Sequence, residues 1–257
     1  MAAFSWDRRI ARAGELAEKH PAARELLRFY QQLAGFQKVV YEKLASFREH
    51  DVPVLLPFFP QLIALARRAG SPALVQAAGT LEQDSSEDRL ELLESIWQHQ
   101  VESRHLRGED AFFAQALLQP YAEYLAGNAG STVDGSASAA LCPFCGSRPV
   151  LAVLRPEGDG AKRFLLCSLC STEWVFRRVL CPNCGEENKD KLPIFSAQEF
   201  DHVRMEACDT CRTYIKSVDL SKNGNAVPVV DELATVSLNF WAQENNYHKL
   251  RPNLFGV

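Results

Sequence analysis

The feature that most constrains this chain is the placing of its eight cysteines, which all lie between positions 142 and 211. They form four Cys-x-x-Cys pairs, which are Cys142/Cys145, Cys167/Cys170, Cys181/Cys184 and Cys208/Cys211. A Cys-x-x-Cys turn presents two thiolates on one side of a tight loop and so supplies half of a tetrahedral four-sulfur metal site. The sequence therefore predicts metal sites that are each built from two such turns.

The pairs repeat with a regular spacing. Within a repeat, 21 residues separate Cys145 from Cys167 and 23 residues separate Cys184 from Cys208, and either interval allows a β-hairpin between the turns. Both opening turns have the sequence CPxCG, whose glycine tolerates the positive φ that such a turn needs. We expect two tandem mononuclear sites, with Cys142, Cys145, Cys167 and Cys170 as ligands in the first and Cys181, Cys184, Cys208 and Cys211 in the second.

Two other uses of paired cysteines compete with metal binding. Structural disulfides are disfavoured because nothing marks the chain as secreted and pairs within one turn cross-link little of the chain. Thioredoxin-like dithiols are compatible with a single CPxC turn, but four copies with hairpins between them argue against redox catalysis at each. Four thiolates suit zinc and rubredoxin-type iron equally, so the spacing alone leaves the metal open.

Composition and apolar runs limit where the chain works. The N-terminal sequence MAAFSWDRRIARAGEL contains charges throughout and lacks the apolar core of a secretory signal. The longest apolar run, Leu55 to Ala66, is interrupted by Pro57 and Pro60 and is too short to span a bilayer. We therefore expect a cytoplasmic metalloprotein with no membrane insertion.

Nucleic-acid binding is a weaker hypothesis. It depends on basic residues near Trp174 and Phe176 in the cysteine-rich half, namely Arg148, Lys162, Arg163, Arg177, Arg178 and Arg204. The net charge of −4 argues against it, because a nucleic-acid-binding protein needs a basic face. We expect no nucleic-acid partner.

The predicted fold class is α+β. Residues 1–126 form a helical domain, because apolar residues recur every three or four positions from Pro21 to His50, which predicts one long amphipathic helix there, and Ser71-Pro72 has the form of a helix start. Residues 127–140 are rich in Gly, Ser and Ala and form a linker. A first rubredoxin-like or zinc-ribbon module (141–180), a second (181–226), and a C-terminal helix and tail (227–257) follow.

Strands and the last helix are expected at definite places. Alternating or β-branched segments predict strands at 149–154, 163–166, 173–179, 194–196, 203–206 and 214–219. A single helix is expected to begin at or beside Asp231, with Leu233, Val236 and Phe240 on one face. His202 is expected to be a surface strand residue and not a ligand, since four cysteines already serve its ribbon.

These motifs together resemble a known family. The segments CPFCGSRPV (142–150), LLCSLCSTEW (165–174), VLCPNC (179–184) and ACDTCRTYIK (207–216), with the tail DELATVSLNFWAQENNYHKLRPNLFGV (231–257), are similar to the bacterial formate dehydrogenase accessory protein FdhE family. The likeness extends to RRIARAGELAEKHP (8–21) and so covers nearly the whole chain.

The resemblance implies an accessory or maturation factor and not an enzyme. It implies that the chain binds the catalytic subunit of respiratory formate dehydrogenase in the cytoplasm, as a chaperone does. It further implies that the eight cysteines hold iron in two rubredoxin-like sites, with zinc as the alternative metal. The rival hypothesis is an iron-dependent redox or sulfur-transfer enzyme acting on the same client. Homodimerisation is left open.

Overall fold

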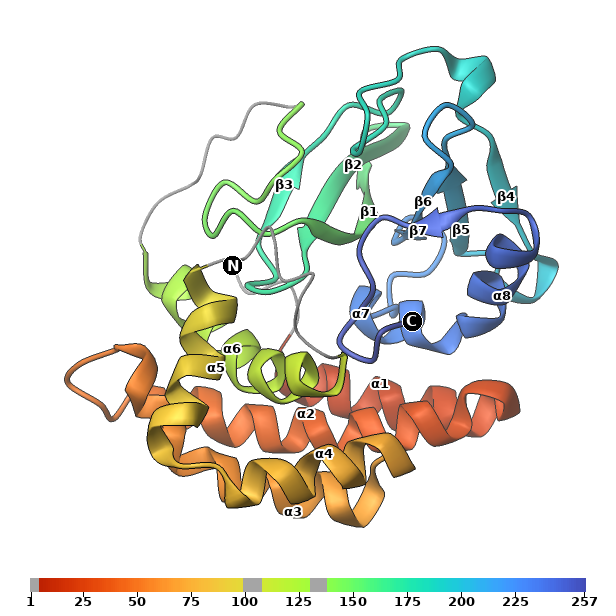
Figure 1. Cartoon of the computed structure of the whole chain (residues 1–257). Coiled ribbons are helices and arrows are strands. Elements are labelled where there is room, and N and C mark those ends of the chain that lie inside the picture. Colours follow the sequence, from red (N-terminus) through yellow and green to blue (C-terminus); the bar gives the residue numbers. More distant parts are fainter. Residues whose placement is uncertain (1–4, 99–107, 130–137) are drawn as a thin grey trace.

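A computed structural model describes residues 5–98, 108–129 and 138–257 of the chain. Its N-terminal half is a layer of helices, and its C-terminal half is a mixed sheet that lies above this layer in Figure 1. The helices are α1 (Trp6–Lys19), α2 (Arg24–Leu44), α3 (Phe59–Ala69), α4 (Pro72–Gln83), α5 (Ser86–Gln98) and α6 (Gly108–Asn128), with short 3-10 helices η1 (Pro21–Ala23) and η2 (Val52–Phe58). This arrangement confirms the predicted α+β class. The predicted linker, 127–140, lies mostly outside the described residues.

Helix α4 begins where the sequence signals predict it. The long helix expected from Pro21 to His50 is instead divided into η1, α2 and a following loop. Ser71 caps α4, accepting a hydrogen bond from the Leu74 amide, and Pro72 takes the first helical position. The helix expected from Pro21 to His50 is shorter, because α2 ends at Leu44. There the Ser46 hydroxyl donates to the Lys43 carbonyl at 2.6 Å and competes with the helical hydrogen-bond pattern.

The sheet joins both cysteine-rich repeats. Its strands are β1 (Pro149–Glu157), β2 (Gly160–Cys167), β3 (Glu173–Val175), β4 (Ile194–Ser196), β5 (Val203–Ala207), β6 (Thr213–Asp219) and β7 (His248–Lys249). Each repeat makes an antiparallel hairpin, β1–β2 or β5–β6, and the order is β3-β2-β1-β6-β5-β4, with β7 beside β6. Parallel pairing of β1 with β6, where Ala152 lies opposite Ser217, links the two hairpins. The division of the chain into domains stays a prediction.

The C-terminal segment forms two helices where one was expected. These are α7 (Pro228–Ala234) and α8 (Val236–Glu244), and α7 lies between the helical layer and the sheet (Figure 1). The buried Lys216 ammonium donates to the carbonyls of Glu232 and Thr235, so the last carbonyls of α7 find a partner outside a continued helix. Phe240, expected on the packed face, is 59% exposed.

The largest core cluster continues from the helices into the first cysteine-rich repeat. It includes the fully buried Leu33, Phe59 and Leu117 of the helical layer together with Cys167 and Trp174. The indole of Trp174 also donates to the Ala139 carbonyl at 2.8 Å. The helices and the first repeat therefore share one interior.

One described stretch is long and apolar enough to cross a membrane by length and composition alone, Val52–Ala69, with a mean hydropathy of 1.2 over 18 residues. This stretch extends the apolar run at Leu55 to Ala66 by three residues at each end. The stretch comprises η2 and α3, and its Leu55, Phe59 and Leu62 are fully buried in the main core. The core helix of a folded domain passes the same test.

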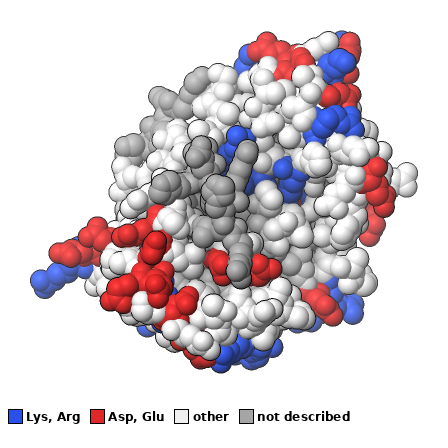
Figure 2. Space-filling model, viewed as in Figure 1, with Lys and Arg blue, Asp and Glu red and all other residues white. Residues whose placement is uncertain are grey.

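Basic side chains are dispersed on the face drawn in Figure 2, whereas acidic side chains gather at its lower left. Among the side chains coloured there, Lys and Arg lie in small groups between acidic and uncharged residues and make no continuous basic surface.

Candidate metal centre

Each of the four Cys-x-x-Cys pairs folds into the same turn. The amide of the first cysteine donates to the carbonyl five residues on, so Cys142 reaches Ser147 at 2.8 Å and Cys208 reaches Thr213 at 2.9 Å. Gly146 and Gly185 adopt φ values of 73° and 78°, as the CPxCG pattern predicts. The closing turns use non-glycine residues at positive φ, Ser171 at 54° and Arg212 at 57°. The backbone thus fixes the direction of every thiol.

The structure brings the cysteines together in the two predicted groups. The first cluster is Cys142, Cys145, Cys167 and Cys170, and the second cluster is Cys181, Cys184, Cys208 and Cys211; within each, the four Sγ atoms lie within 4.8 Å of one another. All eight thiols are free. No described histidine belongs to either cluster, and the role of the cysteines as ligands stays a prediction.

The sulfur separations fit a tetrahedral ion. In the first cluster, Cys142 Sγ lies 3.5 Å from Cys170 Sγ. In the second, Cys181 Sγ lies 3.7 Å from Cys211 Sγ. A tetrahedral metal with ~2.3 Å metal–sulfur bonds places its sulfur atoms about 3.8 Å apart, whereas a disulfide needs ~2.05 Å. Either cluster could therefore hold one metal ion.

The close packing of the thiols shifts the pKa values of neighbouring cysteines in opposite directions. Hydrogen bonds from the thiols of Cys142 and Cys167 hold the pKa of Cys145 far below its ordinary value. Burial raises the pKa of Cys167 well above it. Four thiolates at this spacing repel one another, so a cation at their centre favours the form in which all four are ionised.

The two clusters differ in their surroundings. In the first, only Cys145 is partly exposed, and the cluster touches the helical layer: Gln119 of α6 donates to the Ser168 carbonyl at 3.1 Å. The Ser171 hydroxyl donates to Glu123 of α6 at 2.6 Å, and Glu123 pairs with Arg9 of α1 at 2.8 Å.

In the second cluster Cys184 is exposed and Cys211 is partly exposed. Its closing turn contacts the C-terminal tail, where the Tyr247 hydroxyl donates to Asp209 at 2.6 Å and the Arg212 guanidinium lies 3.9 Å from the centre of the Tyr247 ring. Tyr247 therefore packs against this turn as well as anchoring the tail.

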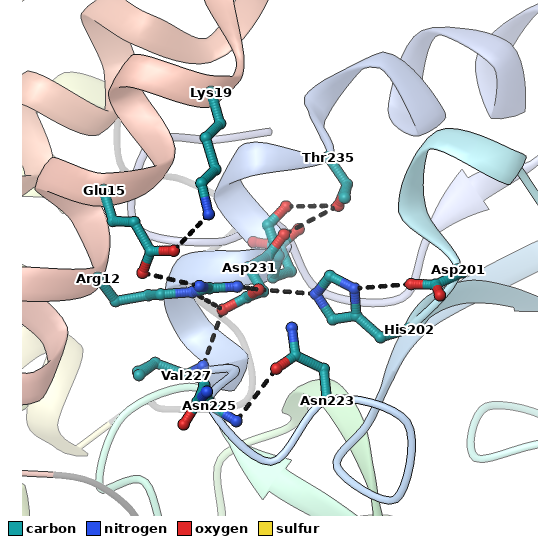
Figure 3. Close-up of polar contacts among 11 residues, drawn as sticks. Arg12, Glu15, Lys19, Asp201, His202, Asn223, Asn225, Val227, Asp231 and Thr235 are labelled. Atoms are coloured by element: carbon teal, nitrogen blue, oxygen red, sulfur yellow. Dashed lines mark hydrogen bonds and ion pairs between the residues drawn. The ribbon is translucent and has the colours of Figure 1, made fainter.

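A network of buried charges, which sequence reasoning missed, joins α1, α7 and the second repeat (Figure 3). The Asp231 carboxylate is 1% exposed and accepts hydrogen bonds from Arg12 at 2.6 Å and from the Val227 amide at 2.8 Å. His202 Nε2 lies 2.7 Å from the same carboxylate, so His202 is largely buried and not the surface residue that was expected. Burial raises the pKa of Asp231, but His202 and Arg12 outweigh burial and lower it.

A second missed network centres on Glu232. Lys216 Nζ lies 3.0 Å from its carboxylate and Lys249 Nζ lies 2.5 Å from it. Burial lowers the pKa of Lys216 to about 8. The adjacent acids Asp231 and Glu232 thus attach α7 to the helices and to the sheet. The sequence signal that could have indicated these ion pairs is the acidic pair itself at the start of the DEL segment.

Comparison with known proteins identifies relatives along the whole chain. A family model described as "FdhE, central domain" matches residues 141–178, and one described as "FdhE, C-terminal domain" matches residues 179–255. The "Protein FdhE homolog" of Aquifex aeolicus is 28% identical over 265 residues, which cover 94% of this chain and 92% of that protein. The "Protein FdhE homolog" of Pseudomonas aeruginosa is 30% identical over 278 residues, covering 96% and 88%.

A solved structure agrees with the fold. The crystal structure of the FdhE protein from Pseudomonas aeruginosa superposes with a TM-score of 0.76 at 27% sequence identity, covering 98% of this chain and 95% of that chain. The superposed region, 98% of this chain, includes its helices, its sheet and both cysteine clusters. The chain therefore belongs to the FdhE family.

Proposed function

We propose that this chain is an accessory factor that respiratory formate dehydrogenase needs for assembly or activity, and that it binds the catalytic subunit of that enzyme in the cytoplasm. Two findings support the proposal. The chain belongs to the FdhE family, and it has two four-cysteine clusters of matching geometry in one sheet. The observation that carries the proposal is the presence of both clusters in a chain whose fold aligns along 98% of its length with an FdhE structure.

The eight cysteines are proposed as the ligands of two mononuclear ions, iron first and zinc as the alternative. The sulfur separations suit either metal. A bound ion would cross-link the two turns of its cluster, and iron would in addition have an accessible electron. Metal analysis and an absorption spectrum of protein purified without air test this point. Two irons per chain with ferric charge-transfer bands support iron, and two zincs with a featureless spectrum replace it with zinc.

A cell-based experiment tests the role in formate dehydrogenase maturation. A bacterial strain that lacks its own FdhE protein is supplied with this chain or with the variant Cys142→Ala/Cys181→Ala, and formate dehydrogenase activity is measured. We expect the wild type to restore activity and the double variant to lose both metal and activity. Ser168→Ala, which changes a non-cysteine position of the same kind of turn, is the matched control.

Three outcomes would contradict the proposal. Full activity with the metal-free double variant would remove the need for the clusters. Failure of the wild type to bind the purified catalytic subunit would remove the partner. Turnover of a thiol or sulfide donor by the metal-loaded protein would contradict the assignment as a non-enzyme and favour the redox or sulfur-transfer alternative.

A further inference from the structure

A hollow of about 140 Å³ lies where the two cysteine-rich repeats meet. One wall is the segment after β3, which includes Arg178 and Val179, and the other wall includes Ile194 of β4 and Arg204 of β5. Cys181 and Cys208 of the second cluster also line it. The hollow is therefore built from both repeats and lies beside the more exposed cluster.

Two aliphatic side chains at the hollow are unusually exposed. Val179 is 44% exposed and Ile194 is 56% exposed, although they come from different repeats. Ile194 lies on β4, the last strand in the sheet order, whose outer edge has no strand beside it among the described residues. Large aliphatic groups that converge on a hollow at a sheet edge are typical of a surface that a second polypeptide covers.

The charges in the hollow do not balance. Apart from the two cysteines, its lining holds three arginines, Arg163, Arg178 and Arg204, and one carboxylate, Glu206, which leaves a formal charge of +2 (three minus one) for these four side chains. Arg163 and Arg204 both pair with Glu206, at 2.8 and 3.0 Å. Burial raises the pKa of Glu206, but the two arginines outweigh burial and lower it, so this carboxylate is ionised. Arg178 contacts no described carboxylate and donates to the Ala161 carbonyl at 2.9 Å.

One buried donor in this lining is unsatisfied. The Arg163 side chain is 3% exposed, and its Nε–H has no hydrogen-bond acceptor among the described residues. One face of its guanidinium lies 5.1 Å from the centre of the Phe176 ring, which fixes its orientation. Burying a charged donor without an acceptor is costly, and a ligand oxygen that reached this Nε–H would remove that cost.

We propose that this hollow receives a segment of the partner polypeptide that carries an aliphatic side chain next to an aspartate or glutamate. The aliphatic group packs between Val179 and Ile194, and the carboxylate faces the arginines. This inference rests on the proposed function, in which the chain binds a polypeptide client, and it places the contact beside the second cluster. The apolar rim distinguishes such a segment from nucleic acid, which would need an extended basic face.

The affinity of the purified chain for the purified catalytic subunit of formate dehydrogenase tests the inference. Arg178→Glu/Ile194→Glu is expected to weaken binding at least tenfold, because it repels the carboxylate and removes half of the apolar rim. Lys189→Glu/Val75→Glu makes the same charge and polarity changes at exposed positions outside the hollow, and is expected to bind like wild type. Metal content and melting temperature are compared in all three proteins.

A photo-cross-linking amino acid at position 194 gives a second readout that does not depend on variant stability. We expect it to cross-link to a subunit peptide that contains Asp or Glu, and the same probe at position 75 to give no such product. Unchanged affinity of the Arg178→Glu/Ile194→Glu variant would overturn the hollow as the docking site while leaving the proposed function intact. Absence of binding by the wild type would overturn both, and RNA binding that is lost on Arg178→Glu would replace the polypeptide with nucleic acid.

Discussion

The two cysteine clusters have the same local structure and different surroundings. Both are built from pairs of identical turns, and in each a threonine hydroxyl contacts the last cysteine, Thr172 with Cys170 at 3.1 Å and Thr213 with Cys211 at 3.0 Å. The first cluster belongs to the main core, which continues into the helices, whereas the second is near the surface and borders a hollow. Cys184, in the second cluster, is exposed.

This difference shows how one motif takes on two roles. A metal ion in the first cluster would stabilise the contact between the sheet and the helical layer, because Ser168 and Ser171 bond to α6. A metal ion in the second cluster would stabilise mainly its own repeat and the tail around Tyr247. The first cluster is therefore expected to control global stability, and the second is expected to control the local structure beside the hollow.

The largest expected effect comes from removing one cluster at a time. Cys142→Ser/Cys167→Ser and Cys181→Ser/Cys208→Ser each remove two thiolates, and a structural metal site contributes folding free energy on the order of 10 kcal/mol. We expect the first variant to lose amide hydrogen-exchange protection in α6 and the second to keep it. Equal loss of protection in α6 would show that the clusters do not differ in their coupling to the helices.

A smaller effect is expected from the ion pair behind the first cluster. Glu123→Gln leaves the Arg9 guanidinium, whose side chain is 5% exposed, without its counter-charge. Breaking such a buried pair costs about 3–5 kcal/mol, which urea unfolding would measure. Glu187→Gln, which breaks the exposed pair with Arg177, is the control and is expected to leave stability unchanged. A change no larger than the control's would mean that Glu123 does not connect the first cluster to the helices.

Metal release offers a kinetic test of the same difference. Because Cys184 is exposed, the second cluster is expected to open locally, and a chelator is expected to remove its ion roughly tenfold faster than the ion of the first cluster. Native mass spectrometry during chelation, with Cys181→Ser/Cys208→Ser protein to identify each ion, would follow the two losses. Release of both ions in one step would indicate that the clusters open together.

The smallest effect concerns pH. The hydrogen bond to Asp231 raises the pKa of His202 above its ordinary value of 6.5, against the opposing effect of burial. A raised folded pKa means that protonated His202 stabilises the fold fully below about pH 6.5 and that this contribution is lost as pH rises through the folded pKa. The melting-temperature difference between wild type and His202→Gln is therefore expected to shrink across that interval. His248→Gln is the exposed control, and a difference that stays constant with pH would exclude titration of His202.

The sequence predicted the parts of the site that depend on short-range pattern. The grouping of the cysteines, the hairpins between them and the glycines at positive φ follow from residue type and spacing. The predicted strand at 173–179 was too long, because β3 ends at Val175 and the Arg177 carbonyl then accepts from the Arg163 side chain at 2.9 Å instead of from a neighbouring strand. That turn also helps to form the hollow.

Long-range partners could not be predicted in this way. The Arg9–Glu123 pair joins residues 114 positions apart, and Arg12 and Asp231 are 219 positions apart. Local periodicity contains no information on which buried charges will meet, and a parallel strand pair such as β1 with β6 leaves no turn signal between its members. One long C-terminal helix was expected for the same reason, since the lysine that ends α7 comes from a distant strand.

The contact between Arg12 and Asp231 can form only after both residues have been synthesised, which limits the order of folding. Helix α1 leaves the ribosome before α7, because Asp231 lies 219 positions after Arg12, and the repeat that carries His202 is also translated before Asp231. The helical layer and the first cluster can form beforehand, because their residues are all made by position 170. Docking of α7 thus follows formation of the helical layer and the first cluster, and a nascent or truncated chain that stops before position 231 lacks the ion pair that joins α1 to α7 and the second repeat.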